Sequence, residues 1–271
     1  MRRASPWVYA ALLAVVLGSV LPLAWSFLAS SQDNASIGQT PPVLVPGGNL
    51  PGNLRRVFDE AAFGKAIVNS FAVSGSVTIC VVVSSTFAGF AFAKLRFRGR
   101  RTLMVMVVST MLIPPQLGIV PLYLLMSRLG WTGHLQAVIV PSMVSAFGVF
   151  FMWQYLGRAV TDELLDAARV DGCSAGAIMR HVVIPAARPG AAVLALFTFV
   201  QAWNDFMWPL VVLDPENPTV PVALSTLASG YYEDYSLVLT GTAVGTIPTL
   251  VVFALFGRRI VGEIMPRAVG N

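Results

Sequence analysis

The stretch "AIVNSFAVSGSVTICVVVSSTFAGFAFA", residues 66–93, contains no Asp, Glu, Lys or Arg and exceeds the roughly 20 residues that a helix needs to cross a bilayer core. The whole chain shares this character, with 56% hydrophobic and 11% charged residues and a mean hydropathy of +0.72. We therefore predict an all-α, polytopic integral membrane protein, one transmembrane domain over residues 1–271. The six expected transmembrane helices are residues 7–29, 66–93, 102–126, 135–155, 190–213 and 237–256.

The first apolar run follows Arg2 and Arg3, as the apolar region of a cleavable secretory signal would. Its apolar stretch is too long for such a signal. In addition, Pro22, Trp25 and Phe27 stand where a cleavage site of small residues would be expected. We interpret this run as a retained membrane helix.

Positive charge predicts the orientation, because cytoplasmic loops of membrane proteins hold an excess of Lys and Arg. With the N-terminus inside, the outer segments hold only Arg55, Arg56, Lys65 and Arg128 of the 18 basic residues. Both termini are therefore expected in the cytoplasm. The net charge of +5 follows from this topology and does not indicate a nucleic-acid partner.

Two outer segments are long enough to hold structure of their own. Residues 30–65 begin with Pro- and Gly-rich irregular chain and continue with a predicted short amphipathic helix. In residues 214–236 a short apolar piece is either a re-entrant or surface-lying element or part of an interfacial aromatic belt. The helix would carry Leu54, Val57, Phe58, Ala61 and Ala62, and the belt Tyr231, Tyr232 and Tyr235.

The cytoplasmic segment 157–189, which we name the coupling loop, predicts two short helices joined by a glycine. Asp162 is expected to cap the first helix and Gly172 to end it, while Ser174 is expected to cap the second and Pro185 to stop it. Small residues would line the bend, and Ile178 and Met179 would be exposed without a core to bury them. Such an element predicts that another protein docks there.

The run "DELLDAARVDGCSAGAIMRHVVIPAARPG" from Asp162 resembles the cytoplasmic signature of ATP-binding-cassette importer permeases. That signature is Glu-Ala-Ala, three residues, Gly, nine residues and Ile-x-Leu-Pro. Four further motifs are similar to the carbohydrate-uptake branch, in particular the second permease of maltose-type systems. They are "NSFAVSG" from Asn69, "AFAKLRFRGR" from Ala91, "IPPQLGIVPLYLLMSRLG" from Ile113 and "WNDFMWPL" from Trp203.

The resemblance implies a division of labour in a bacterial cytoplasmic membrane. Two permeases would form the pathway as a heterodimer, two ATPase subunits would dock below, and an extracytoplasmic binding protein would deliver a sugar. The chain has no Gly-x-x-x-x-Gly-Lys-Ser/Thr loop, so it is expected to be no enzyme and to bind no cofactor, with ATP held by the partner subunits. The implied ATPase-coupling residues are Asp166, Ala167, Ala168, Gly172, Ile178, Met179 and Pro185.

Three positions depart from the family pattern. Asp166 replaces the usual glutamate and shortens its reach by one methylene, and Met179 stands where an aromatic residue is common. The tail after Arg259 reads "IVGEIMPRAVGN" instead of a glycine-rich ending. The resemblance therefore does not extend to a contact between the tail and the ATPase.

Asp205 is the main candidate for a solute contact, because a carboxylate within a span is costly unless it is paired or faces water. We expect it about 6 Å outward from the middle of the fifth span, at about 1.5 Å per residue. Trp203 and Asn204 could supply a stacking face and an amide for a sugar. The alternative is that Asn204 and Asp205 fix the helix against a neighbour.

Other functions find little support. Cys80, Cys173, His134 and His181 show no metal-ligand spacing, and no cluster of acids and histidines suggests a membrane-embedded enzyme. An importer of a glycerol-phosphate-type solute shares the same motifs and remains an alternative. An ATP-independent secondary transporter would need charged or broken helices near the midplane and would leave the signature unexplained.

Overall fold

The computed structural model describes residues 5–41, 44–229 and 234–264, with backbone alone for 258–264. Throughout these ranges the regular structure is helical and contains no strand. Five helices in them are long and apolar enough to span a membrane, or six if one sharply bent pair counts as a span. The fold class is thus the expected one. Arg2, Arg3, Tyr231, Tyr232 and the end of the tail lie outside the described residues.

One compact unit comprises residues 1–67 and 218–248. It holds α1 (Pro6–Ala29), α2 (Asn34–Ile37), α3 (Leu50–Glu60), α13 (Val220–Ala228), the start of α4 (Phe63–Lys94) and residues 235–248 of α14 (Tyr235–Ile264). The predicted short helix of segment 30–65 is present as α3, which buries Val57 and Asn53 and ends before Ala61 and Ala62. The apolar piece of segment 214–236 forms the short helix α13.

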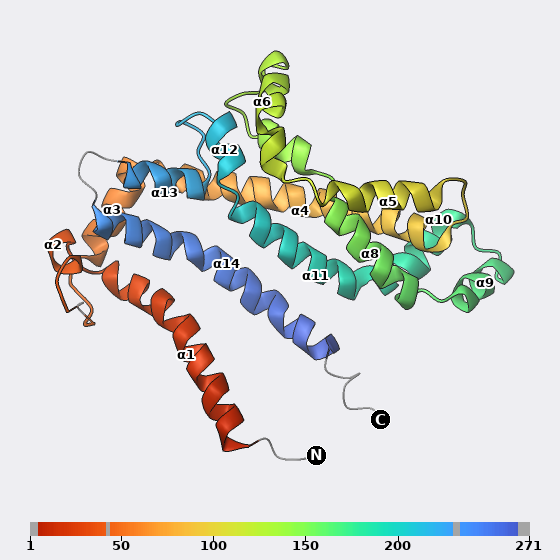
Figure 1. Cartoon of the computed structure of the whole chain (residues 1–271), viewed down its shortest axis with the longest axis horizontal. Coiled ribbons are helices and arrows are strands. Elements are labelled where there is room, and N and C mark those ends of the chain that lie inside the picture. The colour runs from red at the N-terminus through yellow and green to blue at the C-terminus, as the bar shows by residue number, and fades with distance from the viewer. Residues whose placement is uncertain (1–4, 42–43, 230–233, 265–271) are drawn as a thin grey trace. The chain divides into compact units, whose positions relative to one another are not determined.

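The second unit comprises residues 68–217 and 249–271. Figure 1 shows its helices, with the rest of α4 followed by α5 (Arg100–Thr110), α6 (Ile119–Arg128), α8 (Ala146–Ala159), α9 (Asp162–Val170), α10 (Ala175–Ile178), α11 (Ile184–Trp203) and α12 (Met207–Val212). Single turns η1 (Pro115–Gly118), α7 (Gln136–Ile139) and η2 (Val140–Ser142), the π-helical turn η3 (Met179–Val183) and residues 249–264 of α14 complete it. Helix α8 packs against both α5 and α11.

The core of the second unit lies where α4, α8 and α11 meet. Met152, Leu156 and Leu194 are fully buried there. Because lipid is as apolar as these side chains, helices in a membrane associate through close packing, which small residues permit. Gly190 of α11 lies against the Tyr155 ring, so that a Cβ built there would come within 2.6 Å of a ring carbon.

The predicted third span, residues 102–126, is wrong as one straight helix. Helix α5 ends at Thr110, and the chain turns by 91° before η1 and α6. Two consecutive prolines explain the break, because Pro114 and Pro115 have no backbone N–H to continue a helical ladder. Hydropathy alone does not reveal such a bend.

The predicted fifth span, residues 190–213, is also displaced. Helix α11 begins at Ile184, ends at Trp203, and is followed after a three-residue break by the separate helix α12. Asp205 therefore lies in the break between two helices and not inside a span. The amide of Asn204 terminates α11 by donating from Nδ2 to the carbonyl of Val200 at 2.8 Å.

Candidate functional site

A cavity of about 730 Å³ opens beside the break between α11 and α12. Ligand pockets typically measure about 300–1,000 Å³ and combine an apolar lining with a few polar groups. This cavity fits that description, since valines of α4 face amides and hydroxyls from three other segments. Its polar lining consists of Gln116, Ser142, Ser145, Thr198, Gln201, Asn204 and Asp205.

The cavity owes its shape to interrupted helices. The bend before α6 brings η1 to its wall, and the end of α11 opens another wall. Asp205 accepts a hydrogen bond from the backbone N–H of Trp208, in the first turn of α12. A carboxylate in this position satisfies a donor that the helix start would otherwise leave without an intrahelical partner.

Asn204 and Asp205 both line the cavity, and Trp203 does not belong to its described lining. The indole of Trp203 is only 2% exposed and stacks on Phe199, with ring centroids 5.7 Å apart. The Phe71 ring meets it edge-on at 4.8 Å. The three rings thus hold the last turn of α11 against α4 and fix the position from which Asn204 and Asp205 project.

Gln116 and Gln201 complete the polar lining, and neither is among the site residues predicted from the sequence. Both are exposed, Gln116 on η1 and Gln201 on the last turn of α11. Each is an uncharged polar residue in a strongly apolar run, which was the available signal because polar groups in membrane helices tend to be functional. A prediction based on charged residues alone does not include them.

The first helix of the coupling loop is α9, and its ends are defined by local rules. Thr161, and not Asp162, is the N-cap, since its hydroxyl accepts from the N–H of Leu164 at 3.4 Å. Asp162 is instead the first helical residue, where its negative charge interacts favourably with the positive end of the helix dipole.

Gly172 ends α9 as predicted, with a φ of +75° that favours glycine. Around it the N–H of Cys173 bonds to the carbonyl of Ala168 and the N–H of Gly172 to that of Arg169, each at 3.0 Å. This pair of bonds is a Schellman motif, which satisfies the last carbonyls of a helix and turns the chain sharply.

Ser174 caps α10 as predicted by accepting from the N–H of Ala177 at 3.3 Å. The expectation that Pro185 stops this helix is wrong. Helix α10 passes through η3 into α11, and the N–H of Ile184 bonds to the carbonyl of Met179, five residues back. The wider π-helical turn lets the chain continue into Pro185, which sits in the first turn of α11, where a missing N–H costs little.

The apolar surface of the coupling loop differs from the expected one. Ile178 is 8% exposed and belongs to the core, and Met179 packs against that core, so the prediction that both are exposed is wrong. The exposed large apolar side chains are instead Leu164 (44%) and Val170 (87%) of α9 and Ile184 (40%) at the start of α11. Of the signature residues, Asp166, Ala167, Gly172 and Pro185 are exposed and Ala168 is buried.

Two ion pairs order the coupling loop. Asp166 pairs with Arg169 one turn along α9 at 2.7 Å, with both side chains exposed. Lys94, at the end of α4, contacts Asp162 at 2.8 Å and is itself only 10% exposed. The Lys94 ammonium, through a hydrogen bond and its charge, lowers the pKa of Asp162 below its ordinary value. Helix α9 is therefore attached at its start to the end of a long helix.

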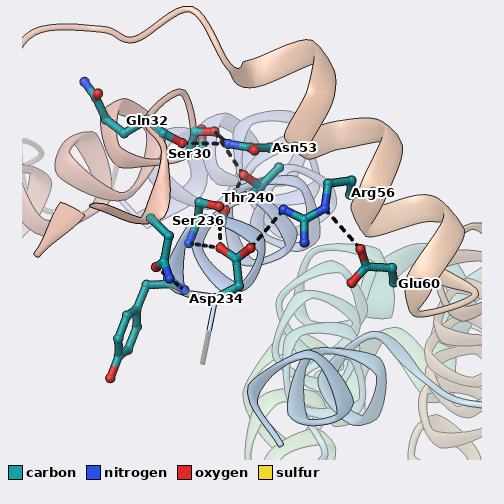
Figure 2. Close-up of polar contacts among 10 residues, drawn as sticks. Ser30, Gln32, Asn53, Arg56, Glu60, Asp234, Ser236 and Thr240 are labelled. Carbon is teal, nitrogen blue, oxygen red and sulfur yellow. Dashed lines mark hydrogen bonds and ion pairs between the residues drawn. The ribbon is translucent and has the colours of Figure 1, made fainter. Parts of the chain in front are cut away.

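The first unit contains a second polar cluster, the α3–α14 network, shown in Figure 2. Arg56 of α3 bonds to Asp234 at 2.9 Å and to Glu60 at 3.1 Å. Asn53 donates to the carbonyls of Ser30 and Gln32 at 3.0 and 2.8 Å, and the Thr240 hydroxyl contacts the same Ser30 carbonyl. The network thus ties the end of α1 to α3 and to the start of α14.

Asp234 is held ionised within this network. Burial raises the pKa of its carboxyl, but the hydrogen bonds from Ser236 and Arg56 together lower this pKa by more than burial raises it. The pKa therefore lies below its ordinary value. Neutral pH therefore leaves the Arg56–Asp234 ion pair intact. Its geometry is that of a structural tie between segments.

The described residues form no candidate metal site. Across the described residues, no three His, Cys, Asp or Glu side chains lie close enough to hold a metal ion. Cys80 and Cys173 are both free thiols.

Comparison with known proteins places the sequence among transport components. The family described as "Binding-protein-dependent transport system inner membrane component" matches residues 85–266. The arabinooligosaccharides transport system permease protein AraQ of Halalkalibacterium halodurans is 31% identical over 244 residues, covering 89% of this chain and 87% of the relative.

Two further relatives cover nearly all of both chains. The sn-glycerol-3-phosphate transport system permease protein UgpE of Pectobacterium atrosepticum is 30% identical over 91% of each chain. The lactose transport system permease protein LacG of Rhizobium radiobacter is 28% identical over 96% of each.

A solved structure shares the fold. It is a chain of a bacterial ABC transporter involved in the import of the acidic polysaccharide alginate, with a TM-score of 0.79 and 22% identity. The match covers 95% of this chain and 99% of that one. At this identity the likeness shows the fold alone.

Proposed function

Since this chain belongs to the family of binding-protein-dependent transport system inner membrane components, we propose that it is the permease subunit of an ATP-binding-cassette importer for a sugar or sugar derivative. The observation that carries the proposal is the coupling loop. An exposed helix, a left-handed glycine and a capped second helix occupy the positions of the importer signature. Relatives named for arabinooligosaccharide and lactose transport support a sugar as the solute.

The proposed assembly contains the partners that the resemblance to importer permeases implies. A second permease would complete the pathway as a heterodimer, and an extracytoplasmic binding protein would deliver the solute. Two ATPase subunits would bind and hydrolyse ATP, because the sequence has no phosphate-binding loop and this subunit is proposed to be neither an enzyme nor a cofactor carrier. Both termini and the coupling loop would face the cytoplasm, as the distribution of Lys and Arg predicts.

The coupling loop supplies a physical route for force. Leu164, Ala167 and Val170 lie on exposed positions of α9 and can enter an apolar groove of the ATPase. The Lys94–Asp162 pair joins the start of α9 to α4, and η3 makes α10 continuous with α11. Closure of the ATP-bound ATPase dimer would thus move two long helices together and exchange inward-facing and outward-facing states.

Uptake measurements test this function. Deleting the gene should abolish ATP-dependent uptake of the radiolabelled solute, measured with a panel of lactose, arabinotriose and sn-glycerol-3-phosphate, and the wild-type gene should restore it. Gly172→Asp should lower restored uptake at least tenfold while membrane insertion is unchanged, because it places a charge at the docking bend. Co-purification with the ATPase should fall in parallel.

Two control variants separate docking from backbone strain. Gly172→Ala introduces the strain of a positive φ, of about 1 kcal/mol, without a charge. Gly99→Asp introduces the same charge at another left-handed glycine, with φ +80° and open space for a Cβ, in the loop between α4 and α5. Both should retain most uptake. Normal uptake by Gly172→Asp, or unchanged uptake after deletion, would overturn the proposal.

A second candidate solute is of the glycerol-phosphate type, which the likeness to UgpE favours. The two candidates differ in charge, so the chemistry of the cavity bears directly on the choice between them.

A further inference from the structure

The charge of the residues that line the cavity beside α11 is unlike that of a site that binds anions. Asp205 is the one ionisable side chain among its described lining residues, and these include no Lys, Arg or His. Sites that bind phosphate or carboxylate usually present Arg or Lys, whose N–H groups donate strong, charge-assisted hydrogen bonds. This lining offers an anion a carboxylate instead.

The remaining polar groups suit hydroxyls. Gln116, Gln201 and Asn204 each carry an amide with both donors and an acceptor, and Ser142 and Thr198 carry hydroxyls that do the same. Both glutamines are exposed and come from different walls, one from η1 and one from α11. Hydrogen bonds from two directions can hold a ring with several hydroxyl groups.

The apolar lining complements this polar side. Val73, Val77 and Val81 recur along one face of α4, and Ile119 and Leu122 of α6 join them. The C–H faces of a sugar ring pack well on such a surface, whereas a fully hydrated phosphate gains nothing from it. The cavity therefore matches a molecule that is apolar on its ring faces and polar at its edges.

We infer that this cavity takes an uncharged, hydroxyl-rich solute, of the class of neutral sugars and oligosaccharides, and rejects phosphorylated or carboxylated ones. Gln116 and Gln201 recognise the hydroxyls, and Asp205 repels anions, because like charges at short range repel each other. The inference rests on the proposed function, since it assigns the solute class of that same pathway. It separates this chain's solute from glycerol phosphates and acidic polysaccharides.

A cysteine-protection experiment on the assembled transporter in native membranes tests the inference. In a background with Cys80→Ala and Cys173→Ala, the variant Ser142→Cys places a thiol in the cavity wall, and its rate of modification by N-ethylmaleimide is measured. The probes are a matched pair that differs only by a phosphate group, lactose and lactose 6-phosphate, together with arabinotriose. Lactose or arabinotriose should halve the rate at a concentration at least tenfold lower than lactose 6-phosphate.

A variant that adds a positive charge to the cavity should shift its preference toward the phosphorylated probe. Gln201→Lys in the same background should lower the half-protecting concentration of lactose 6-phosphate about tenfold, a change of about 1.4 kcal/mol. The control Gln136→Lys adds the same charge at an exposed glutamine on α7, outside the cavity lining, and should leave the preference unchanged. Equal protection by lactose and its phosphate, or no protection by any probe, overturns the inference.

The outcome is independent of the test of the proposed function. If uptake depends on ATP and on Gly172 but the cavity shows no preference for uncharged sugars, the permease function stands and the inference is wrong. If no probe is taken up in an ATP-dependent way, the proposed function fails, while the protection experiment still reports what the cavity binds.

Discussion

Glycines decide how closely the helices of the second unit approach. At Gly89 of α4, a built Cβ would lie 2.7 Å from the carbonyl carbon of Met152 and 2.8 Å from the backbone nitrogen of Trp153. Backbone atoms of α8 cannot move aside as the end of a flexible side chain can. Gly75, on the same helix α4, has no heavy atom within 4 Å of its built Cβ. The two glycines therefore form a matched pair.

Gly89→Ala should lower the free energy of unfolding by about 1–3 kcal/mol, because the added methyl forces α4 and α8 apart. Gly75→Ala should have no cost or raise stability by up to about 1 kcal/mol, since alanine favours a helix more than glycine does. Unfolding of the purified chain in detergent measures both. Equal effects of the two substitutions would show that α4 and α8 do not approach closely at Gly89.

Residue-level predictions succeeded where the determining interaction is local. Gly172 and Ser174 were identified correctly because a Schellman turn and a serine cap depend on neighbours within a few residues. The sequence predicts Asp162 as the N-cap of α9, whereas the N-cap is its neighbour Thr161. Both residue types cap helices, so the sequence alone does not distinguish them. Ile178 is buried because it packs against residues that are distant in the sequence, in the core of the second unit. The local sequence pattern cannot predict such contacts.

At the scale of elements, a tryptophan compensates for a proline. In a regular helix the carbonyl of Ala137 would accept from the backbone N–H of residue 141, which is a proline and has none. The indole N–H of Trp208, on α12, donates to this carbonyl at 3.0 Å. The bond is buried and joins α12 to α7 beside the cavity, so it positions one wall of the cavity.

Trp208→Phe should lower the free energy of unfolding by about 1–3 kcal/mol, because it leaves the buried Ala137 carbonyl without this donor. It should also loosen the cavity wall and weaken the protection of Ser142→Cys by lactose. Trp7→Phe, at a side chain that is 83% exposed on α1, should change stability by less than about 0.5 kcal/mol. Similar stability losses in both variants would contradict the role assigned to the indole N–H.

Element positions were predictable from hydropathy, but their interruptions were not. The runs at 7–29, 66–93 and 237–256 correspond closely to α1, α4 and α14. The breaks after Thr110 and Trp203 lie inside two of the predicted apolar runs, where the average hydropathy stays high, and they shape the cavity. Asn204 and Asp205 were therefore found as polar exceptions, while the geometry that brings Gln116 and Gln201 to the same cavity required the structure.

At the scale of the whole molecule, charge determines the direction in which the chain crosses the membrane. The coupling loop and the 94–101 segment are rich in arginine, whereas the α3–α14 network lies in segments that hold few of the basic residues. Cytoplasmic loops retain Lys and Arg, so these two groups of segments are expected on opposite sides. The proposed coupling to a cytoplasmic ATPase requires this arrangement.

Single cysteines test the orientation in the background without Cys80 and Cys173. Asp59→Cys, at an exposed position of α3, should react with a membrane-impermeant maleimide in intact spheroplasts. Ala175→Cys, at an exposed position of the coupling loop, should react only after the membrane is permeabilised. Both must label fully in detergent, which controls for local accessibility. Labelling of Ala175→Cys from outside would place the coupling loop away from any cytoplasmic ATPase, because a loop exposed on that face cannot receive force from ATP hydrolysis.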